Sequence, residues 1–393
     1  MLLGNSDRIR RQLTDLAALG KTPDGICRLA YSDSFRKSND YVAGLMRQAG
    51  MEVSQSPVGN VVGTYPGQTD RRIVMGSHID SVVNGGMFDG CLGVIAAIEA
   101  VRTLHENGVQ PFHTLDVAAF AEEEGVVFTG LVGSRAYCGL PPTPLMAEKM
   151  NQFGFTEEDF SNARAKGPLD YSLELHIEQG GVLESRKTDI GVVSAIIALK
   201  RYIVEFSGTA NHAGTTPMDL RDDALVKAAQ FIRRVREVVM ETDPDMVGTV
   251  GFLEVSPNAM NTIPGRVRLT LELRALNEAS IDAAGRRLME EFSDQIASCR
   301  LTMEQPCYHM DASVRAAIHR ACEALGLSAL DMGSGAGHDS MSLAQVTRAG
   351  MIFVPSVRGI SHSPEEKTEW RDVKNGADVL LQTLCMLDQP AGG

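Results

Sequence analysis

The sequence predicts an α/β fold interrupted by a smaller α+β domain, and three observations support this prediction. The chain has 393 residues, which is more than one hydrophobic core usually serves. In its first half, short apolar runs alternate with helical patterns, as in a sheet whose two faces are covered by helices. Between residues 200 and 312 the element order becomes β-α-β-β-α-β, the ferredoxin-like order.

The elements of the larger domain follow from the apolar pattern. Helical spacing extends over residues 5–50 and is interrupted near Pro23. Four apolar runs, each ending at polar or ionisable residues, predict buried strands. They cover residues 73–75, 115–121, 171–175 and 351–354, with helices expected at 93–104 and 313–325. The last residues, Gln389–Gly393, are expected to be disordered.

The inserted segment has its own pattern. Strands are expected at 201–208, 246–255, 266–275 and 301–308, and helices at 221–241 and 280–298. In 266–275 apolar residues alternate with polar ones, which is typical of a half-buried strand. The predicted domains are therefore 1–199 with 313–393, and an inserted domain at 200–312.

Composition narrows the function classes. The net charge is -13, from 50 acidic and 37 basic residues, which argues against general nucleic-acid binding but allows an anionic small substrate. The seven cysteines are scattered and odd in number, as expected for reduced thiols in a cytoplasmic protein. Neither a signal peptide nor a membrane-spanning stretch is evident, so we expect a cytoplasmic protein without a membrane partner.

Ionisable residues follow the four apolar runs, and they suggest a metal centre. The carboxyl ends of such strands meet at one edge of the sheet. That edge would collect His78, His176, His362 and the Glu122–Glu124 run, with Asp89 arriving across a Gly-rich loop. Histidines and carboxylates suit zinc or manganese, with nickel or cobalt as alternatives. Five ligands are too many for one catalytic ion, so we expect two ions sharing a carboxylate.

Each of these residues alone has a simpler explanation. A single histidine after a strand is usually hydrogen-bonded and binds no metal, and a run of three glutamates is usually a solvated surface. The joint occurrence at several strand ends favours the metal centre. Asp80 is then expected to accept the other ring N–H of His78 and so to orient that ring.

Eight segments, in order along nearly the whole chain, resemble the hydantoinase/carbamoylase branch of the M20 metallopeptidase family. They cover residues 77–82, 88–90, 122–125, 175–180, 211–218, 261–265, 334–340 and 359–364. The branch includes N-carbamoyl-L-amino-acid hydrolases, allantoate amidohydrolases and β-ureidopropionases. In peptidase relatives a carboxylate often occupies the position of His176, so the run His176–Gly180 is specific to this branch.

The resemblance implies a mixed-sheet, α/β/α metallopeptidase-like catalytic domain, with the inserted domain serving as a lid and in a homodimer. It implies one ion on His78, His176 and Asp89 and a second on Asp89, Glu124 and His362. Glu123 would be the general base. A cis peptide bond is implied at Asp89–Gly90.

The same resemblance implies substrate-binding residues. His212 would reach the active site of the partner subunit and stabilise the oxyanion, while Asn261 and Arg274 would hold a substrate carboxylate. Gln179 would bind the carbamoyl group, and His338 would contact substrate. Without the resemblance, Arg274 would be taken as an exposed strand residue and His212 as a turn residue.

The implied reaction is hydrolysis of an N-carbamoyl-L-amino acid to the amino acid, carbon dioxide and ammonia. Allantoate and N-carbamoyl-β-alanine remain alternative substrates, since Val126 and Val127 depart from the patterns of both carbamoylases and allantoate enzymes. An aminopeptidase or N-acyl amino acid deacylase is disfavoured by His176. A metal-binding or structural dimer that has lost catalytic activity is a further alternative. It is disfavoured, because such a protein would lack a metal ligand or the general base, and the sequence contains all of them.

Overall fold

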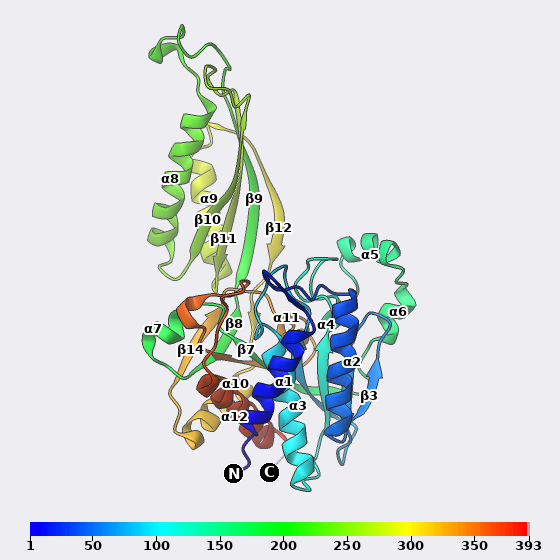
Figure 1. The fold of residues 1–393 in the computed structure, drawn as a ribbon. Coiled ribbons are helices and arrows are strands. Elements are labelled where there is room, and N and C mark those ends of the chain that lie inside the picture. Colours follow the sequence, from blue (N-terminus) through cyan, green and yellow to red (C-terminus); the bar gives the residue numbers. More distant parts are fainter. Residues whose placement is uncertain (391–393) are drawn as a thin grey trace. The chain divides into compact units, whose positions relative to one another are not determined.

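The computed structural model describes residues 1–390, and most of the C-terminal segment expected to be disordered lies outside them. Figure 1 shows the chain as a ribbon. It forms two compact units, which are Met1–Ser194 with His309–Gly393, and Ala195–Tyr308.

The first unit is built on a nine-stranded mixed sheet, which confirms the predicted α/β class. Its strand order is β13-β8-β15-β7-β5-β6-β4-β3, and β14 pairs with β8. The strands are β3 (Glu52–Gln55), β4 (Val61–Tyr65), β5 (Arg72–His78), β6 (Thr114–Phe120), β7 (Leu169–Ile177), β8 (Ile190–Ile196), β13 (Tyr308–His309), β14 (Ala329–Ser334) and β15 (Arg348–Val354). The central strands β15, β7, β5 and β6 are parallel, whereas β4, β3 and β8 are antiparallel to their neighbours. A small hairpin, β1 (Lys21–Thr22) and β2 (Gly25–Ile26), stands apart from this sheet.

Helices cover both faces of the sheet. One layer packs on the large core and comprises α1 (Ser6–Ala18), α2 (Asp33–Gln48), α3 (Cys91–Glu106), α10 (Ala312–Leu325) and α12 (Trp370–Leu387). The remaining helices of this unit are α4 (Val132–Tyr137), α5 (Pro144–Met150), α6 (Glu157–Asn162), α7 (Val182–Arg186), α11 (Ser340–Leu343) and the 3-10 turns η1 (Asn151–Phe153) and η3 (Val357–Gly359). Helix α3 is buried on nearly all sides, because its sequence is apolar around the whole helix.

The second unit has the ferredoxin-like element order. It consists of β9 (Ala198–Ser207), η2 (Met218–Leu220), α8 (Ala224–Thr242), β10 (Val247–Ser256), β11 (Arg266–Ala275), α9 (Glu278–Glu291) and β12 (Ile296–Gln305). The four strands form an antiparallel sheet in the order β10-β11-β9-β12. The helix expected at 280–298 ends earlier, at Glu291, because a turn at 292–295 leads directly into β12.

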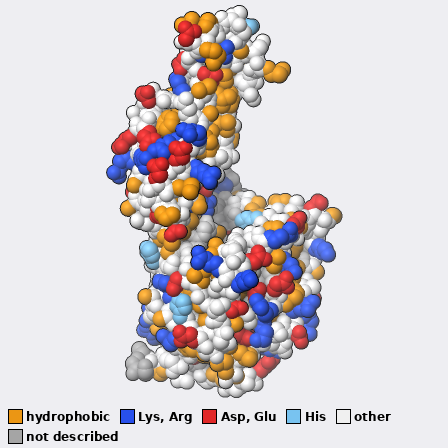
Figure 2. Space-filling view, turned by 90° about the vertical axis from the view of Figure 1, so that its left-hand side faces the viewer, with side chains coloured by type: hydrophobic (Ala, Val, Ile, Leu, Met, Phe, Trp, Pro, Cys, Tyr) orange, Lys and Arg blue, Asp and Glu red, His pale blue; other side chains and the backbone are white. Residues whose placement is uncertain are grey.

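Helices α8 and α9 pack against one face of this sheet. That face carries Val267, Leu269, Leu271 and Leu273 of β11, which are fully buried as the alternation predicts. The outer surface of the two helices is a network of ion pairs centred on Arg234, whose guanidinium contacts Glu237, Glu241 and Glu291. Figure 2 shows closely mixed acidic and basic side chains in this region.

Within residues 1–390, no helix combines the length and the apolar character needed to cross a membrane.

Candidate metal centre

Parallel strands bring the predicted ligands to one edge of the first unit's sheet. His78 is the last residue of β5, and Glu122–Glu124 directly follow β6. His176 lies near the end of β7, and His362 lies in the loop after η3, which follows β15. In register, His78 is opposite Phe120 and His176 is opposite Phe353, so these strands end at the same level.

The first group of ligand atoms surrounds one oxygen of Asp89. Oδ1 of Asp89 lies 3.4 Å from Nε2 of His78 and 3.2 Å from Nε2 of His176. The three side chains are buried, and one ligand atom from each lies within 4.8 Å of the others. This spacing suits three ligands of one ion.

The second group surrounds the other oxygen of Asp89. Nε2 of His362 lies 3.4 Å from Oδ2 of Asp89 and 3.4 Å from Oε2 of Glu124. These three residues also offer ligand atoms within 4.8 Å of one another. Each oxygen of the Asp89 carboxylate therefore faces a different set of ligands.

Two of the imidazole rings are oriented by main-chain carbonyl groups. Nδ1 of His78 lies 3.1 Å from the carbonyl oxygen of Asp80, and Nδ1 of His176 lies 2.9 Å from that of Ile177. Because a carbonyl oxygen can only accept a hydrogen bond, Nδ1 carries the proton in both rings. Nε2 of each ring is then unprotonated and faces Asp89, which is the usual arrangement of histidine ligands, and Nε2 of His176 also accepts the main-chain N–H of Gly90 at 3.1 Å.

These contacts show that the Asp80 carboxylate does not accept the ring N–H of His78, which the sequence had predicted it would. Its Oδ1 lies 3.8 Å from Nδ1 of His78, too far for a hydrogen bond, and the main-chain carbonyl of Asp80 is the acceptor instead. The carboxylate accepts the main-chain N–H groups of Glu123 and Glu124, at 3.3 and 3.2 Å. Asp80 therefore shapes the glutamate loop as well as the His78 ring.

The peptide bond at Asp89–Gly90 is also not as expected. Among the described residues the cis bond is Ser256–Pro257, so Asp89–Gly90 is trans. Gly90 has a φ of 63°, and this conformation, open to glycine, makes the sharp entry into α3 without a cis bond.

A cavity of about 200 Å³ opens onto the two ligand groups. Besides the five ligand residues, its lining contains Glu123, Gln179, Ala336, Gly337 and His338. The Gln179 amide donates to Oδ2 of Asp89 at 2.9 Å, while its Oε1 is buried and has no hydrogen-bond partner among the described residues. The cavity therefore contains an open hydrogen-bond acceptor beside the ligands.

Burial and neighbouring charges shift the acid–base behaviour of this cavity. Burial raises the pKa of Glu123 well above its usual value, although the nearby His78 opposes the shift. Burial also raises the pKa of Asp89, but the adjacent imidazole groups of His176, His362 and His78 outweigh it and hold that pKa well below its usual range. Burial lowers the pKa of His338, and the adjacent His176 lowers it further. His338 is therefore a neutral imidazole.

These donors fit divalent ions. Imidazole nitrogens and carboxylate oxygens are the ligands that zinc, manganese and similar ions prefer. The buried carboxylates of Asp80 and Asp89 lie together with Glu123 and Glu124, and such a concentration of negative charge is costly without a compensating cation.

The other predicted site residues belong to the second unit. His212 is exposed and pairs with Thr262 in a β-bridge, and the main-chain carbonyl of Asn261 accepts the N–H of Ala213 at 2.9 Å. The segments carrying His212 and Asn261 therefore lie side by side. Arg274, on β11, forms an ion pair of 2.7 Å with Glu272.

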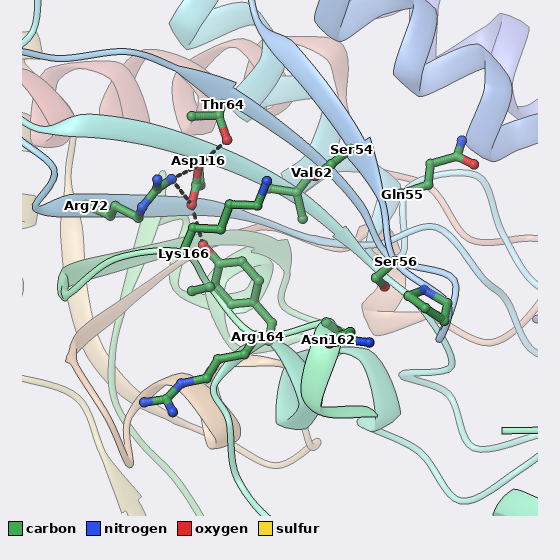
Figure 3. Close-up of a pocket in the computed structure, with 14 residues that line it drawn as sticks. Ser54, Gln55, Ser56, Val62, Thr64, Arg72, Asp116, Asn162, Arg164 and Lys166 are labelled. Carbon is green, nitrogen blue, oxygen red and sulfur yellow. Dashed lines mark hydrogen bonds and ion pairs between the residues drawn. The ribbon is translucent and has the colours of Figure 1, made fainter. Parts of the chain in front are cut away.

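A second cavity in the first unit, of about 230 Å³, has a different character (Figure 3). Its acidic residue, Asp116, is held by Arg72 at 2.7 Å, by Thr64 at 2.7 Å and by Tyr137 at 2.6 Å. These donors satisfy the Asp116 carboxylate, so it is not an open metal ligand or base.

Comparison with known proteins agrees with this geometry. The model of peptidase family M20/M25/M40 matches residues 74–385. The N-carbamoyl-L-amino acid amidohydrolase of Geobacillus stearothermophilus is 39% identical over 98% of both chains. The chain belongs to the M20 peptidase family.

Other relatives of this M20 family member place it among the amidohydrolases. The allantoate amidohydrolase of Escherichia coli K12 is 34% identical, over 96% of this chain and 97% of the relative. A solved hydantoinase/carbamoylase family amidase from Burkholderia multivorans is 32% identical, with a TM-score of 0.90 over 99% of this chain and 100% of the other. These similarities confirm the resemblance seen in the sequence motifs.

Two polar residues of the centre were not predicted from the sequence. Ser361 donates to Oδ2 of Asp89 at 3.1 Å, and the buried Glu366 accepts the main-chain N–H of Asp89 at 3.1 Å. Both follow β15 in the loop that carries His362. Their nearness to His362 in the sequence could have suggested a role in the centre. It could not show that their side chains point toward Asp89.

Proposed function

We propose that this M20 family member hydrolyses the ureido C–N bond of N-carbamoyl-L-amino acids, using two divalent ions. The observation that carries the proposal is the Asp89 carboxylate, whose Oδ1 faces His78 and His176 and whose Oδ2 faces His362. A bridging carboxylate of this kind is typical of hydrolytic sites with two ions. His78, His176 and Asp89 would hold one ion, and Asp89, Glu124 and His362 the other.

The bound ions would polarise the ureido carbonyl and lower the pKa of water. Glu123 lines the cavity without belonging to either ligand group, and its raised pKa suits a group that accepts and returns a proton. It takes the proton of the attacking water and delivers it to the leaving nitrogen. The free Oε1 of Gln179 accepts an N–H of the carbamoyl group, and the neutral His338 contacts the substrate.

Specificity for the rest of the substrate is assigned to the second unit. Arg274 and Asn261 bind the substrate carboxylate, for which the guanidinium fork is well shaped. His212 stabilises the oxyanion in the active site of the partner subunit. This part of the proposal requires a homodimer. Exposed apolar side chains on the edge strands β10 and β12, including Phe252, Leu253, Leu301 and Met303, support an interface there.

The preferred ureido substrate is inferred from the activities named for the relatives. The first three relatives, at 36–39% identity, are N-carbamoyl-L-amino-acid amidohydrolases, and the allantoate amidohydrolases are at 33–34%. Val126 and Val127 follow the glutamates in this chain. Neither side chain lines the cavity beside the two ligand groups, so the relatives carry the substrate assignment.

The test is an ammonia-release assay with protein stripped of metal and then reconstituted with Zn²⁺, Mn²⁺, Ni²⁺ or Co²⁺. The panel contains several N-carbamoyl-L-amino acids, N-carbamoyl-β-alanine, allantoate and an N-acetyl amino acid. We expect metal-dependent hydrolysis, fastest on an N-carbamoyl-L-amino acid. Full activity without metal would refute the mechanism, and a preference for allantoate or the N-acetyl compound would refute the substrate assignment.

The dimer is tested separately by light scattering coupled to size exclusion. We expect twice the mass of the chain. A fully active monomer would remove the role proposed for His212 in the partner subunit's site.

A further inference from the structure

Glu366 is a buried carboxylate behind the metal centre that has no place in the mechanism described so far; its residue is 6% exposed. We propose that Glu366 is a positioning residue, which fixes Asp89 and the His362 loop relative to each other so that both ligand groups form. This inference rests on the proposed function, because it concerns the same centre.

One oxygen of Glu366 holds the main chain at Asp89. Oε1 accepts the N–H groups of Phe88 and Asp89, at 2.9 and 3.1 Å. Two hydrogen bonds to one carboxylate oxygen fix the orientation of consecutive peptide groups. The direction in which the Asp89 side chain leaves the main chain is therefore set by Glu366.

The other oxygen reaches the segment that carries His362. Oγ of Ser361 lies 2.9 Å from Oε2 of Glu366 and 3.1 Å from Oδ2 of Asp89. Ser361 directly precedes His362 and is 272 residues from Asp89 in the chain. The Ser361 hydroxyl therefore contacts the carboxylates of both Asp89 and Glu366. Through its neighbour His362, it connects these two residues to the other ligand segment.

The surroundings leave little freedom for this carboxylate. A Cβ atom at Gly86 would lie 2.2 Å from Cδ of Glu366, so the chain can approach the carboxylate this closely only because residue 86 is glycine. The ring of Phe88 also packs edge-on against Trp370, with ring centres 5.4 Å apart. The segment next to Asp89 is therefore held by this ring contact as well as by Glu366.

The test is metal affinity, measured by competition with a chromogenic chelator for Zn²⁺ and for Mn²⁺. Glu366→Ala removes every contact described above, and we expect it to weaken the affinity about 10- to 100-fold, as is usual for residues that orient metal ligands. Glu366→Gln keeps an oxygen for the two N–H groups and offers an amide to Ser361. Its affinity should return most of the way to the wild-type value.

Two further variants separate positioning from folding. Glu365→Ala is the matched control, because Glu365 is exposed and pairs with Arg358 on the same loop; its metal affinity should be unchanged. Ser361→Ala removes only the connection between the two carboxylates. We expect a weaker affinity in this variant, and less than additive loss when it is combined with Glu366→Ala.

A lower melting temperature with wild-type metal affinity in Glu366→Ala would show a merely structural role and overturn the inference. If that variant does not fold, Ser361→Ala decides, and an unchanged affinity overturns the inference. The failure of the proposed function looks different: wild-type protein would bind metal tightly and hydrolyse no carbamoyl substrate. Wild-type protein that binds no metal would overturn both.

Discussion

Asp89 is the residue on which both ligand groups depend. Oδ1 faces the imidazoles of His78 and His176, Oδ2 faces that of His362, and Gln179 and Ser361 add hydrogen bonds to Oδ2. The histidines on the Oδ1 side are held by main-chain carbonyls with Nε2 turned inward. At this scale the centre is preorganised, since the ligand atoms already converge through contacts within the protein.

Glu123→Gln is expected to bind metal as the wild type does and to lose about 10²- to 10⁴-fold in kcat, the usual contribution of a general base. The amide keeps the shape of the side chain but cannot take a proton. Turnover of N-carbamoyl-L-amino acids and metal content per chain are the measurements. Glu122→Gln is the control, because Glu122 accepts the N–H of Val127 and does not line the cavity. Near wild-type turnover in Glu123→Gln would remove Glu123 as the base.

Arg274→Ala is expected to raise KM for carboxylate-bearing substrates by roughly 10- to 100-fold, since a hydrogen bond to a charged group contributes about 1.5–3 kcal/mol. The value of kcat should change little. Arg266→Ala is the matched control, because Arg266 lies on the same strand and pairs with Glu205. An unchanged KM in Arg274→Ala would show that Arg274 does not bind the substrate carboxylate.

At the scale of elements, four neighbouring parallel strands create the centre. Their apolar runs and their polar endings are both visible in the sequence, because a strand buried on both faces needs a continuous apolar run. The end of α9 was wrong in the sequence prediction, since helical spacing continues past Glu291 into Ile296. The strands β3, β4, β8 and β14 of this sheet were not predicted.

Helix α8 offers a test of local structure within the second unit. Asp223 caps it by accepting the N–H of Leu225 at 2.9 Å, so Asp223→Ala should lower the free energy of unfolding by about 0.5–2 kcal/mol. Asp222→Ala is the control. It removes only an exposed ion pair with Lys227, which should contribute about 1 kcal/mol or less. Urea unfolding followed by circular dichroism measures both, and equal effects would contradict the capping role.

At the scale of the molecule, the first unit buries an unusual amount of acidic charge around one cavity. Asp80, Asp89 and Glu366 are all less than 9% exposed, and burial raises the pKa of Asp80 and Glu366 because it disfavours their charged forms. Uncompensated buried charge destabilises a fold. Divalent ions would offset it, so metal binding should stabilise the whole unit as well as enable the reaction.

Metal removal is therefore expected to lower the melting temperature, and re-addition of Zn²⁺ or Mn²⁺ should restore it in a concentration-dependent way. Binding to the folded state alone adds about 4 kcal/mol when the free ion is at 1,000 times its Kd. Differential scanning fluorimetry across a metal titration measures the shift. Asp89→Asn, which weakens both ligand groups, should show little dependence on metal. The same shift in that variant would place the stabilising ions elsewhere.

The sequence by itself determined the class of the fold, the ferredoxin-like order of the second unit and the residues that gather at the strand ends. These follow from periodicity and from residue type at a strand end, which are local properties of a chain. Only the tertiary structure decided that the carbonyl of Asp80 holds His78, and that Ser361 and Glu366 support Asp89. These depend on where side chains point and on contacts between segments hundreds of residues apart, which no local pattern records.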